Sequence, residues 1–308
     1  MKSLNCRNCN KKNNFYELFS LGKLSYTGKF PNNRKIDIPK SEIKLVICNK
    51  CKLVQVSKEF DLNYMYDDNY GYRTGINHTM TSHVKSIVNE LSLRKNFLNK
   101  GDYVLDIASN DATLLNSYQK NLTRVGIDPT INKYRKFYKN IDFKISDFFS
   151  RKKLIKVIKN NKFKTITALA VFYDLKNPNQ FLKEVSEIID EKKGIFILEF
   201  QDLLSIIKNN LFDTICHEHL GYYSTKIILK MVKKNNLKIL DIKKNQINGG
   251  STRFYICHKD ANYKVKENKI KKIIKYELKF KLENKNTYKS FFKKIINIKR
   301  KLNKKIND

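Results

Sequence analysis

The sequence has no hydrophobic run long enough to cross a membrane. Its best apolar stretch, residues 166–173, has the length of a buried strand, whereas a membrane helix needs roughly 18 to 20 apolar residues. The first residues, Met1 to Cys6, also lack the apolar core of a secretory signal. We therefore expect a globular cytoplasmic protein without a membrane span.

Acidic residues are scarce. Lys and Arg number 63 against 29 Asp and Glu, which gives a formal net charge of +34. Such a charge is compatible with nucleic acid, an anionic membrane surface or a phosphorylated substrate as partner. Nucleic-acid binders, however, usually gather basic residues on one face together with aromatic side chains. Here the excess is spread along the chain as lysine, as an AT-rich genome would produce, and is densest in residues 262–308. We do not expect nucleic acid as the partner.

Cysteine is also rare, and four of the six cysteines form two Cys-x-x-Cys motifs. The 38 residues between the motifs leave room for a loop or hairpin over residues 15–47. Four thiolates complete the tetrahedral coordination of zinc and leave no position for a substrate, so we predict a structural zinc site. Two redox pairs are the alternative, and the two remaining cysteines are expected to be buried thiols. The predicted zinc ligands are Cys6, Cys9, Cys48 and Cys51.

The middle of the chain alternates strand and helix patterns, which predicts a parallel sheet with helices on both faces. A helix with an apolar stripe precedes it at residues 76–97. A length of 308 residues suggests about two domains. A hairpin signal at Asn248-Gly249 predicts that the last two strands are antiparallel. The expected strands are residues 103–108, 124–127, 143–145, 165–171, 195–199, 237–242 and 251–257, with helices at 113–119 and 178–189.

Carboxylates end the first two of these strands. Asp106 and Asp128 are 22 residues apart, close to the spacing at which a βαβ unit places a carboxylate on a ribose. The loop at 108–112 lacks the glycines that let a helix terminus approach a pyrophosphate. The pattern therefore favours an adenosine ligand without phosphate at this loop, such as S-adenosylmethionine. Two acids that merely form turns at the strand ends are the alternative.

Side chains suited to acid–base chemistry are most concentrated in residues 213–224, after the fifth strand. His217, Glu218 and His219 offer a base, an acid and a group to orient them near neutral pH. Ligand sites of open α/β sheets lie beyond the carboxyl ends of the strands, where this run is expected. For His217, a structural role in the core is an equal alternative.

Two further segments have open roles. Residues 60–72 carry four tyrosines, of which Tyr72 is the last; they either pin the zinc module to the next domain or donate hydrogen bonds to a substrate oxygen. From residue 264 onward, apolar residues recur at helical spacing amid dense lysine. This amphipathic tail needs a partner surface: the body of the protein, a second copy, an absent domain or an anionic surface.

The ordered set of motifs resembles the deoxysugar C-methyltransferases, which add a methyl group to carbon on nucleotide-linked keto-deoxysugars. The resemblance covers residues 1 to about 260, and the Cys216-His217-Glu218-His219 run is its most specific part. It implies three parts: a zinc-binding module with a Tyr-rich linker (1–75), a methyltransferase domain (76–260) and a Lys-rich helical tail (261–308). The motifs are the two Cys-x-x-Cys pairs, Tyr72-Arg73-Thr74-Gly75 and residues 104–115, 172–175, 212–223 and 247–251.

The resemblance implies a Rossmann-like class I methyltransferase sheet, S-adenosylmethionine as cofactor and structural Zn²⁺. Two departures stand out: the family usually has glycine where this chain has Ala108 and Ala112, and it continues into a second α/β domain. The implied cofactor-binding residues are Asp106, Ser109, Asn110, Asp111, Asp128, Asp147, Phe148 and Phe172, and the implied catalytic residues are His219, Glu218, Tyr72, His217 and Tyr222.

In the implied reaction, His219 removes a proton from the carbon next to a ketone, because an imidazole can do so when the enolate oxygen is stabilised. Glu218 orients His219 or binds a sugar hydroxyl, and Tyr72 or His217 donates a hydrogen bond to the enolate. The carbon then takes the methyl group of the cofactor. An RNA methyltransferase, or a binding or scaffold protein with a decayed site, is the alternative. A dimer or protein partner through the tail would fit its amphipathic pattern.

Overall fold

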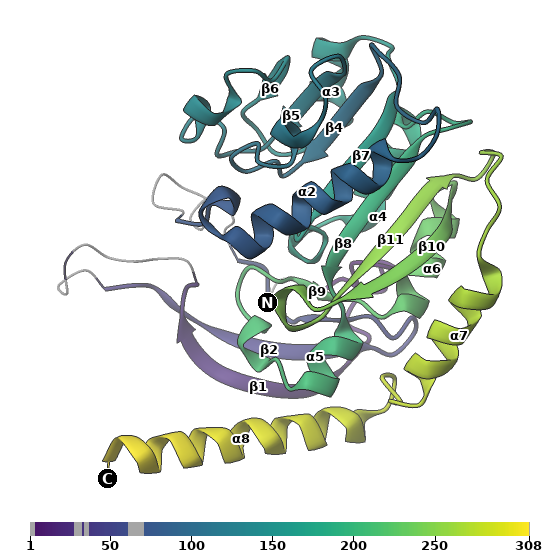
Figure 1. Ribbon diagram of the computed structural model, residues 1–308. Coiled ribbons are helices and arrows are strands. Elements are labelled where there is room, and N and C mark those ends of the chain that lie inside the picture. The colour runs from purple at the N-terminus through teal and green to yellow at the C-terminus, as the bar shows by residue number, and fades with distance from the viewer. Residues whose placement is uncertain (1–3, 28–32, 34–36, 61–70, 308) are drawn as a thin grey trace.

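The chain forms two β-sheets in a computed structural model that describes residues 4–27, 33, 37–60 and 71–307 (Figure 1). The larger has seven strands in the order β10-β11-β8-β7-β4-β5-β6, and we call it the large sheet. Strands β8, β7, β4, β5 and β6 are parallel, and β11 is antiparallel to β8 and β10. The strands are β4 Tyr103–Ile107, β5 Thr123–Ile127, β6 Phe143–Ile145, β7 Phe163–Leu169, β8 Ile195–Gln201, β10 Leu237–Asn245 and β11 Ser251–His258.

Helices cover both faces of the large sheet, which confirms the predicted Rossmann-like α/β fold. Every residue of β8 is buried, as expected of a parallel strand with helices on both sides. On one face Leu182 and Val185 of α4 pack into the core, and on the other Ile87 and Leu91 of α2 do so. The helices are α2 His78–Ser92, α3 Arg151–Ile158, α4 Pro178–Ile188, α5 Leu203–Asn209 and α6 Thr225–Lys234.

One predicted helix is wrong. Residues 113–119 form only a short 3-10 helix, Leu115–Ser117, and a second 3-10 helix, Arg135–Tyr138, follows β5. Ala112 has a positive φ of 60°, so no regular helix enters from the preceding loop. The Ser117 hydroxyl donates to the Thr113 carbonyl at 3.0 Å, a local bond that competes with helix formation.

The four-stranded antiparallel sheet, which we call the small sheet, has the order β1-β2-β3-β9. Of the loop or hairpin expected between the cysteine motifs, the structure has the antiparallel strand pair β1–β2. The fourth, β9, comes from the His-Glu-His run and was not predicted. It starts at Gly221, where a Cβ atom would lie 2.6 Å from the Tyr223 hydroxyl oxygen. The strands are β1 Phe15–Ser25, β2 Lys40–Cys48, β3 Val54–Val56 and β9 Gly221–Tyr222.

The C-terminal tail folds into two helices, α7 Glu267–Leu278 and α8 Lys285–Asn307. Helix α8 runs along β1 (Figure 1), where the ring of Phe292 stacks on Phe19 with 5.1 Å between centroids. The body of the protein therefore supplies part of the partner surface that the tail needs. Further along α8 the apolar residues become exposed, from 40% at Ile298 to 71% at Ile306. Among the described residues, no helix has the length and apolar character to cross a membrane.

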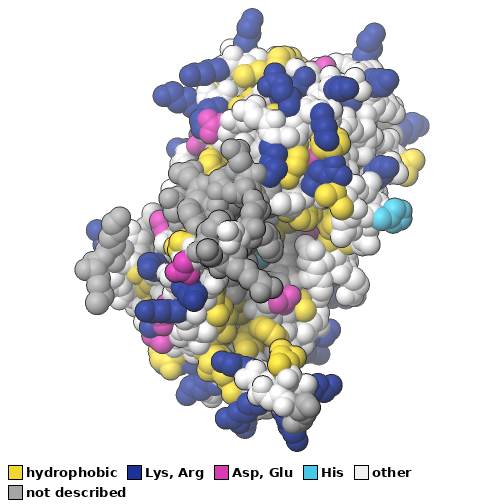
Figure 2. Space-filling view, turned by 90° about the vertical axis from the view of Figure 1, so that its left-hand side faces the viewer, with side chains coloured by type: hydrophobic (Ala, Val, Ile, Leu, Met, Phe, Trp, Pro, Cys, Tyr) yellow, Lys and Arg dark blue, Asp and Glu magenta, His cyan; other side chains and the backbone are white. Residues whose placement is uncertain are grey.

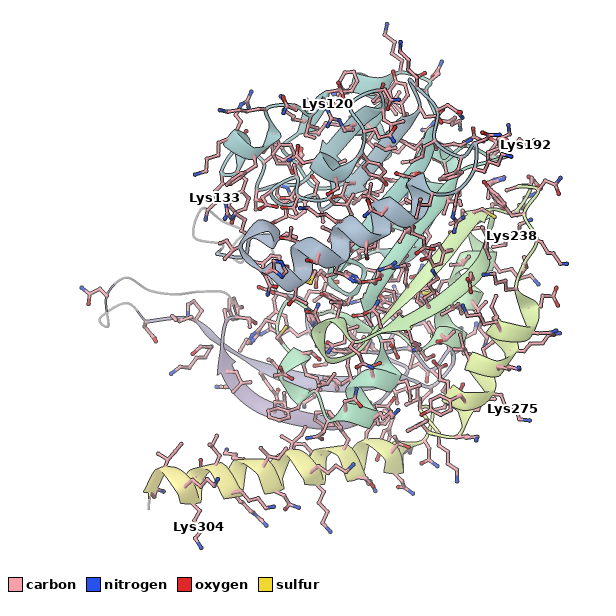
Figure 3. The ribbon with its side chains drawn as sticks, in the orientation of Figure 1. Lys120, Lys133, Lys192, Lys238, Lys275 and Lys304 are labelled. Carbon is pink, nitrogen blue, oxygen red and sulfur yellow. The ribbon has the colours of Figure 1, made fainter. Side chains whose placement is uncertain are left out.

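The positive charge is dispersed over the surface. The lysines labelled in Figure 3 come from different parts of the chain and lie around the outline of the molecule. On the face shown in Figure 2, Lys and Arg side chains are scattered from one end to the other. On the described part of this face, the basic side chains are spread out and are not gathered into one stripe, which agrees with a general surface bias.

Candidate active site

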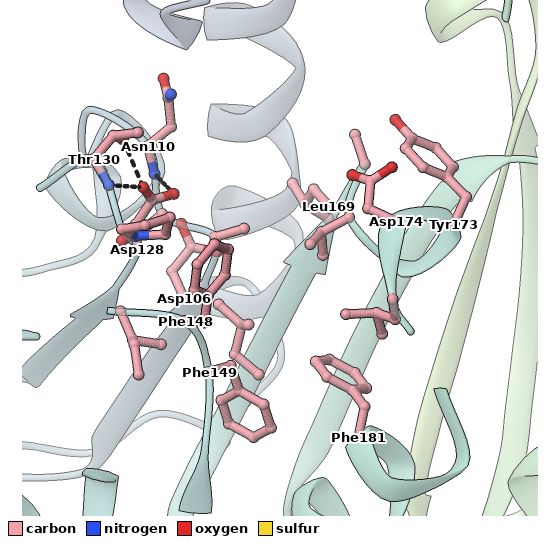
Figure 4. A pocket seen from close by; sticks show the side chains of 18 of the residues that line it. Asp106, Asn110, Asp128, Thr130, Phe148, Phe149, Leu169, Tyr173, Asp174 and Phe181 are labelled. Carbon is pink, nitrogen blue, oxygen red and sulfur yellow. Dashed lines mark hydrogen bonds between the residues drawn. The ribbon is translucent and has the colours of Figure 1, made fainter. Parts of the chain in front are cut away.

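A cavity of about 680 Å³ lies at the carboxyl ends of β4, β5 and β7, where ligand sites of open α/β sheets are expected (Figure 4). One part of its wall consists of strand-end acids, which we call the carboxylate side: Asp106, Asp128 and Asp147. Another part, which we call the imidazole side, consists of Tyr173, Asp174, Glu218 and His219. The residues predicted from sequence that line the cavity are Tyr72, Asp106, Ser109, Asn110, Asp128, Asp147, Phe148, Glu218 and His219.

Asp128 is fixed by backbone donors. One carboxylate oxygen accepts from the Asn110 N–H at 2.9 Å, and the other accepts from the Thr130 N–H at 2.7 Å (Figure 4). The Thr130 hydroxyl also donates to that second oxygen at 2.5 Å. Each oxygen can accept more than one hydrogen bond, so Asp128 can bind a ribose hydroxyl as well.

Asp106 is a buried carboxyl with a raised pKa. Burial raises the pKa of the Asp106 carboxyl to about 7, and the nearby charge of Asp128 raises it too. The Thr167 hydroxyl donates to Asp106 at 2.6 Å, which opposes this effect. At neutral pH, Asp106 therefore exists in both protonated and ionised forms, whereas Asp147 is ion-paired with Lys153 at 2.5 Å.

The loop after β4 adopts a conformation that favours glycine. Ala108, Asn110 and Ala112 have φ angles of 59°, 48° and 60°, in the left-handed region that glycine enters without cost. The two alanines therefore occupy positions where glycine would be unstrained, consistent with the departures noted in the sequence. The Ser109 hydroxyl supports this loop through a 2.7 Å hydrogen bond with the Tyr138 hydroxyl.

His219 lines the cavity, and one of its two ring nitrogens is held by a backbone carbonyl. Its Nδ1 lies 2.7 Å from the Thr214 carbonyl oxygen; a carbonyl only accepts, so Nδ1–H is the donor and Nε2 carries the lone pair. The ring packs on Tyr173 with 3.9 Å between centroids. Burial lowers the pKa of His219 to about 4, so the imidazole is neutral at physiological pH. Burial also raises the pKa of Glu218.

His217 and Tyr222 are not among the residues that line the cavity. His217 is buried under the β1–β2 hairpin, with Nε2 3.2 Å from the Ser41 carbonyl and Nδ1 3.3 Å from the Thr27 hydroxyl. Its ring also packs on Phe60, with 4.7 Å between centroids. Tyr222 is buried in β9, opposite Val54. This placement favours the structural alternative for His217.

Two residues assigned to the cofactor lie outside the cavity lining. Phe172 is fully buried in an aromatic cluster, with its ring 4.9 Å from Tyr223 and 5.7 Å from Phe200 between centroids. Asp111 is part of the loop after β4, and its carboxylate accepts from the Gly75 N–H at 2.9 Å. Tyr72 does line the cavity; the other tyrosines of its segment, Tyr64, Tyr66 and Tyr70, lie outside the described residues.

Sequence reasoning missed Tyr173 and Asp174 as site residues. Both follow β7 directly and line the imidazole side. Their position at a strand end was the available signal, because parallel strands deliver the following residues to one edge of the sheet. The loop is also attached to the His-Glu-His run, since the Leu220 N–H donates to the Tyr173 carbonyl at 2.7 Å. The Cys216 thiol, the Glu218 carboxylate and the His219 imidazole each offer an atom within 4.8 Å of the others.

The four motif cysteines converge at one end of the small sheet. The Sγ atoms of Cys6 and Cys51 are 3.4 Å apart, those of Cys9 and Cys48 are 3.6 Å apart, and all four lie within 4.8 Å of one another. In a zinc tetrathiolate with bonds of about 2.3 Å, neighbouring sulfur atoms are about 3.8 Å apart. The donor set and its geometry therefore fit Zn²⁺.

Two family models match the chain. One, described as a methyltransferase domain, matches residues 76–242, and the other, a C-methyltransferase C-terminal domain, matches residues 246–308. The C-methyltransferase NovU of Streptomyces niveus is 22% identical over 226 residues, which cover 73% of this chain and 53% of NovU. The chain thus spans about half the length of the curated relative that it matches.

Solved structures of methyltransferases are similar as well. Magnesium protoporphyrin IX methyltransferase from Synechocystis PCC 6803 is 14% identical, with 58% of this chain and 79% of that chain covered and a TM-score of 0.43. An S-adenosylmethionine-dependent methyltransferase from Clostridium acetobutylicum is also 14% identical, with 58% and 92% covered and a TM-score of 0.46.

Proposed function

Because the chain belongs to the S-adenosylmethionine-dependent C-methyltransferase family, we propose that it methylates a carbon atom of a nucleotide-linked keto-deoxysugar through an enolate. The observation that carries this proposal is that one cavity is lined both by the strand-end acids Asp106 and Asp128 and by the neutral imidazole of His219. A methyl donor and a base-activated carbon can therefore meet in one space.

The carboxylate side fits S-adenosylmethionine. Asp128 would hold the ribose hydroxyls, the loop after β4 would hold the amino-acid part, and Asp147 with Phe148 would flank the adenine. When bound, S-adenosylmethionine supplies an electrophilic methyl group on sulfur. The conformation of the loop supports this assignment, since the Asn110 N–H is already bound to Asp128 and fixes its position.

The imidazole side fits the acceptor. Nε2 of His219 takes the proton from the carbon next to the ketone, while the Thr214 carbonyl holds Nδ1–H and stabilises the imidazolium that forms. The electron pair left on the carbon would delocalise onto the ketone oxygen and then form the new bond to the methyl group, while the methyl–sulfur bond breaks and S-adenosylhomocysteine leaves. Because Thr214 orients His219, Glu218 is available to bind a sugar hydroxyl. Tyr72 is the remaining donor toward the enolate oxygen.

The cysteine cluster would hold structural Zn²⁺ through Cys6, Cys9, Cys48 and Cys51. Its four sulfur ligands leave no position for a substrate. The metal would therefore stabilise the small sheet without taking part in the chemistry.

Methyl transfer from labelled S-adenosylmethionine tests the proposal, with a panel of nucleotide keto-sugars and total RNA as acceptors. We expect transfer to a keto-sugar and a loss of at least about 100-fold in kcat for His219→Ala, the usual scale for removing a general base. Donor affinity, measured by calorimetry with S-adenosylhomocysteine, should be retained because His219 and Asp128 belong to different elements.

His78→Ala is the matched control, because His78 is an exposed histidine outside the cavity lining. Transfer to RNA alone, unaffected by His219→Ala, would replace the proposed function with RNA methylation. Donor binding with transfer to no acceptor would indicate a decayed site.

A further inference from the structure

The segment that carries Tyr72 lies across the loop after β4. We call residues 71–76 the strap. Its residues face alternate sides: Tyr72 and Thr74 line the active-site cavity, whereas Arg73 and Gly75 line a second pocket of about 550 Å³. The strap therefore forms a partition between the two, and its position determines where Tyr72 stands over the cavity.

The side chain of Asn110 is hydrogen-bonded to the strap at both of its polar atoms. Its Oδ1 accepts from the Thr74 N–H at 2.9 Å, and its Nδ2 donates to the Tyr72 carbonyl at 3.1 Å. The Tyr134 hydroxyl donates to the same carbonyl at 2.9 Å. The backbone of Tyr72 is thus bound to the loop after β4 and to the neighbouring Tyr134.

Asp111 completes the attachment. Its Oδ2 accepts from the Gly75 N–H at 2.9 Å and lies 3.7 Å from Nε of Arg73. Its Oδ1 accepts from the Thr113 hydroxyl at 2.5 Å. Only 3% of Asp111 is exposed, and it does not line the active-site cavity. Both oxygens are therefore committed to the strap and to the loop itself.

The close approach of the strap depends on Gly75. A Cβ atom there would lie 2.6 Å from Oδ2 of Asp111 and 2.9 Å from Oγ1 of Thr113. Gly75 has no positive φ, so alanine would be unstrained in its own backbone but would push the strap off Asp111. The contact can therefore be broken from either partner.

We infer that Asp111 is a positioning residue for the acceptor, which acts by fixing the strap and thereby Tyr72, and is not a ligand of the methyl donor. This inference rests on the proposed function and changes the role that the sequence assigned to Asp111. The loop after β4 then serves both substrates, because the Asn110 N–H fixes Asp128 while the side chains of Asn110 and Asp111 fix the strap.

Native-state trypsin digestion measures the strap directly, because the bond after Arg73 lies within it. We expect cleavage after Arg73 to be at least about tenfold faster in Asp111→Ala, since the charge-assisted bonds that hold the strap are lost. Cleavage after Arg135 in the same digest is the internal control. In kinetic assays, kcat/KM for the acceptor should fall by about tenfold or more, and Asp111→Asn should restore part of it.

Donor affinity distinguishes a positioning role of Asp111 from the alternative that Asp111 is a ligand of the methyl donor. For Asp111→Ala, the Kd of S-adenosylhomocysteine in calorimetry should stay within about threefold of the wild-type value. The inference gives Asp111 no contact with the donor, so its removal costs no donor contact. A weakening of tenfold or more, or unchanged cleavage after Arg73, overturns the inference.

Gly75→Ala provides a second route in case Asp111→Ala does not fold. It leaves Asp111 in place and should give the same pattern of faster cleavage and retained donor affinity; slow cleavage with lost donor affinity would contradict the inference. The digestion and calorimetry need no acceptor. They decide the role of Asp111 even if no keto-sugar is methylated, so failure of the proposed function is recognised separately.

Discussion

The carboxylate side of the cavity is built on the large sheet alone, whereas the imidazole side is also anchored to the small sheet. Asp106 lies within β4, and Asp128 and Asp147 follow β5 and β6. Glu218 and His219 instead stand just before β9, which pairs with β3. Donor binding and base positioning therefore have separate supports, and each can be disturbed while the other is kept.

Gln55 connects the predicted metal site to the imidazole side. This buried residue of β3 accepts from the Arg7 N–H at 3.0 Å and donates to the Asn5 carbonyl at 3.1 Å, both within the first cysteine motif or next to it. Across the strand pair it stands opposite Gly221 of β9. The cysteine cluster is thus one strand away from the segment that holds His219.

Loss of the predicted metal should have the largest effect and should separate the two sides of the cavity most clearly. We expect Cys48→Ser to lose zinc and to lower kcat by at least about 100-fold, because a small displacement of a catalytic group has this effect. Donor affinity should remain within about threefold, since the hydrogen bonds that hold Asp106 and Asp128 come from β7 and from the loops after β4 and β5, not from the cysteine motifs.

Zinc content, calorimetry with S-adenosylhomocysteine and turnover give the three readouts. Cys257→Ala is the control, because Cys257 is a buried thiol outside the cluster. A parallel loss of donor affinity in Cys48→Ser would show that the two sides share one support.

The two strand-end acids should differ in effect although both line the cavity. Asp128→Asn is expected to weaken donor binding by about 10- to 100-fold, because one of the two oxygens that accept hydrogen bonds from the neighbouring loops is replaced by a donor. At pH 6, Asp106→Asn should change donor affinity by less than about threefold, because the amide resembles a protonated carboxyl. The pKa of Asp106, raised to about 7 by burial, underlies this difference.

Calorimetry with S-adenosylhomocysteine checks both variants. The kcat at saturating donor should stay near the wild-type value in each, since the imidazole side is untouched. Equal losses of affinity in the two variants at pH 6 would contradict the protonation assigned to Asp106.

The smallest expected effect concerns pH and the imidazole side. The pKa of His219 is lowered by burial from 6.5 to about 4, so between these values the unfolded chain binds more protons than the folded one. The stability contributed by neutral His219 is therefore complete above about pH 6.5 and is lost as the pH falls toward 4. Between pH 7 and 4.5, the free energy of unfolding of the wild type should fall by on the order of 2 kcal/mol more than that of His219→Gln.

Urea unfolding at a series of pH values measures this difference. His78→Gln, at an exposed histidine, should follow the wild-type curve. An identical pH dependence of wild type and His219→Gln would mean that His219 is not held in its neutral form.

The large sheet could be predicted because each of its strands is marked by a pattern in its own short stretch of sequence. Strand β8, for example, begins with an uninterrupted apolar run over residues 195–198, and parallel strands deliver Asp106 and Asp128 to one edge whatever the rest of the chain does. The convergence of the four motif cysteines could be predicted for the same reason, since each pair is set by a spacing of three residues. Residues at strand ends were therefore the most accessible part of the candidate site.

Pairings between distant segments could not be predicted. Strand β9 has only two residues, and its partner β3 lies more than 160 residues earlier, so no local pattern marks it. The direction of His217 depends on the hairpin that covers it, and the role of Asp111 depends on the approach of the strap. The helix expected at 113–119 failed because a positive φ at Ala112 is a property of the folded loop.

Gly221 constrains how this protein can diverge. A side chain at that position would collide with Tyr223, and Tyr223 cannot retreat because its ring is packed against Phe172 and Phe200. Natural variants that retain the tyrosine should retain the glycine, and descendants that lose the glycine should have lost the tyrosine as well. Substitutions along β9 are therefore expected to accumulate as coupled pairs, which would be visible as covariation between positions 221 and 223.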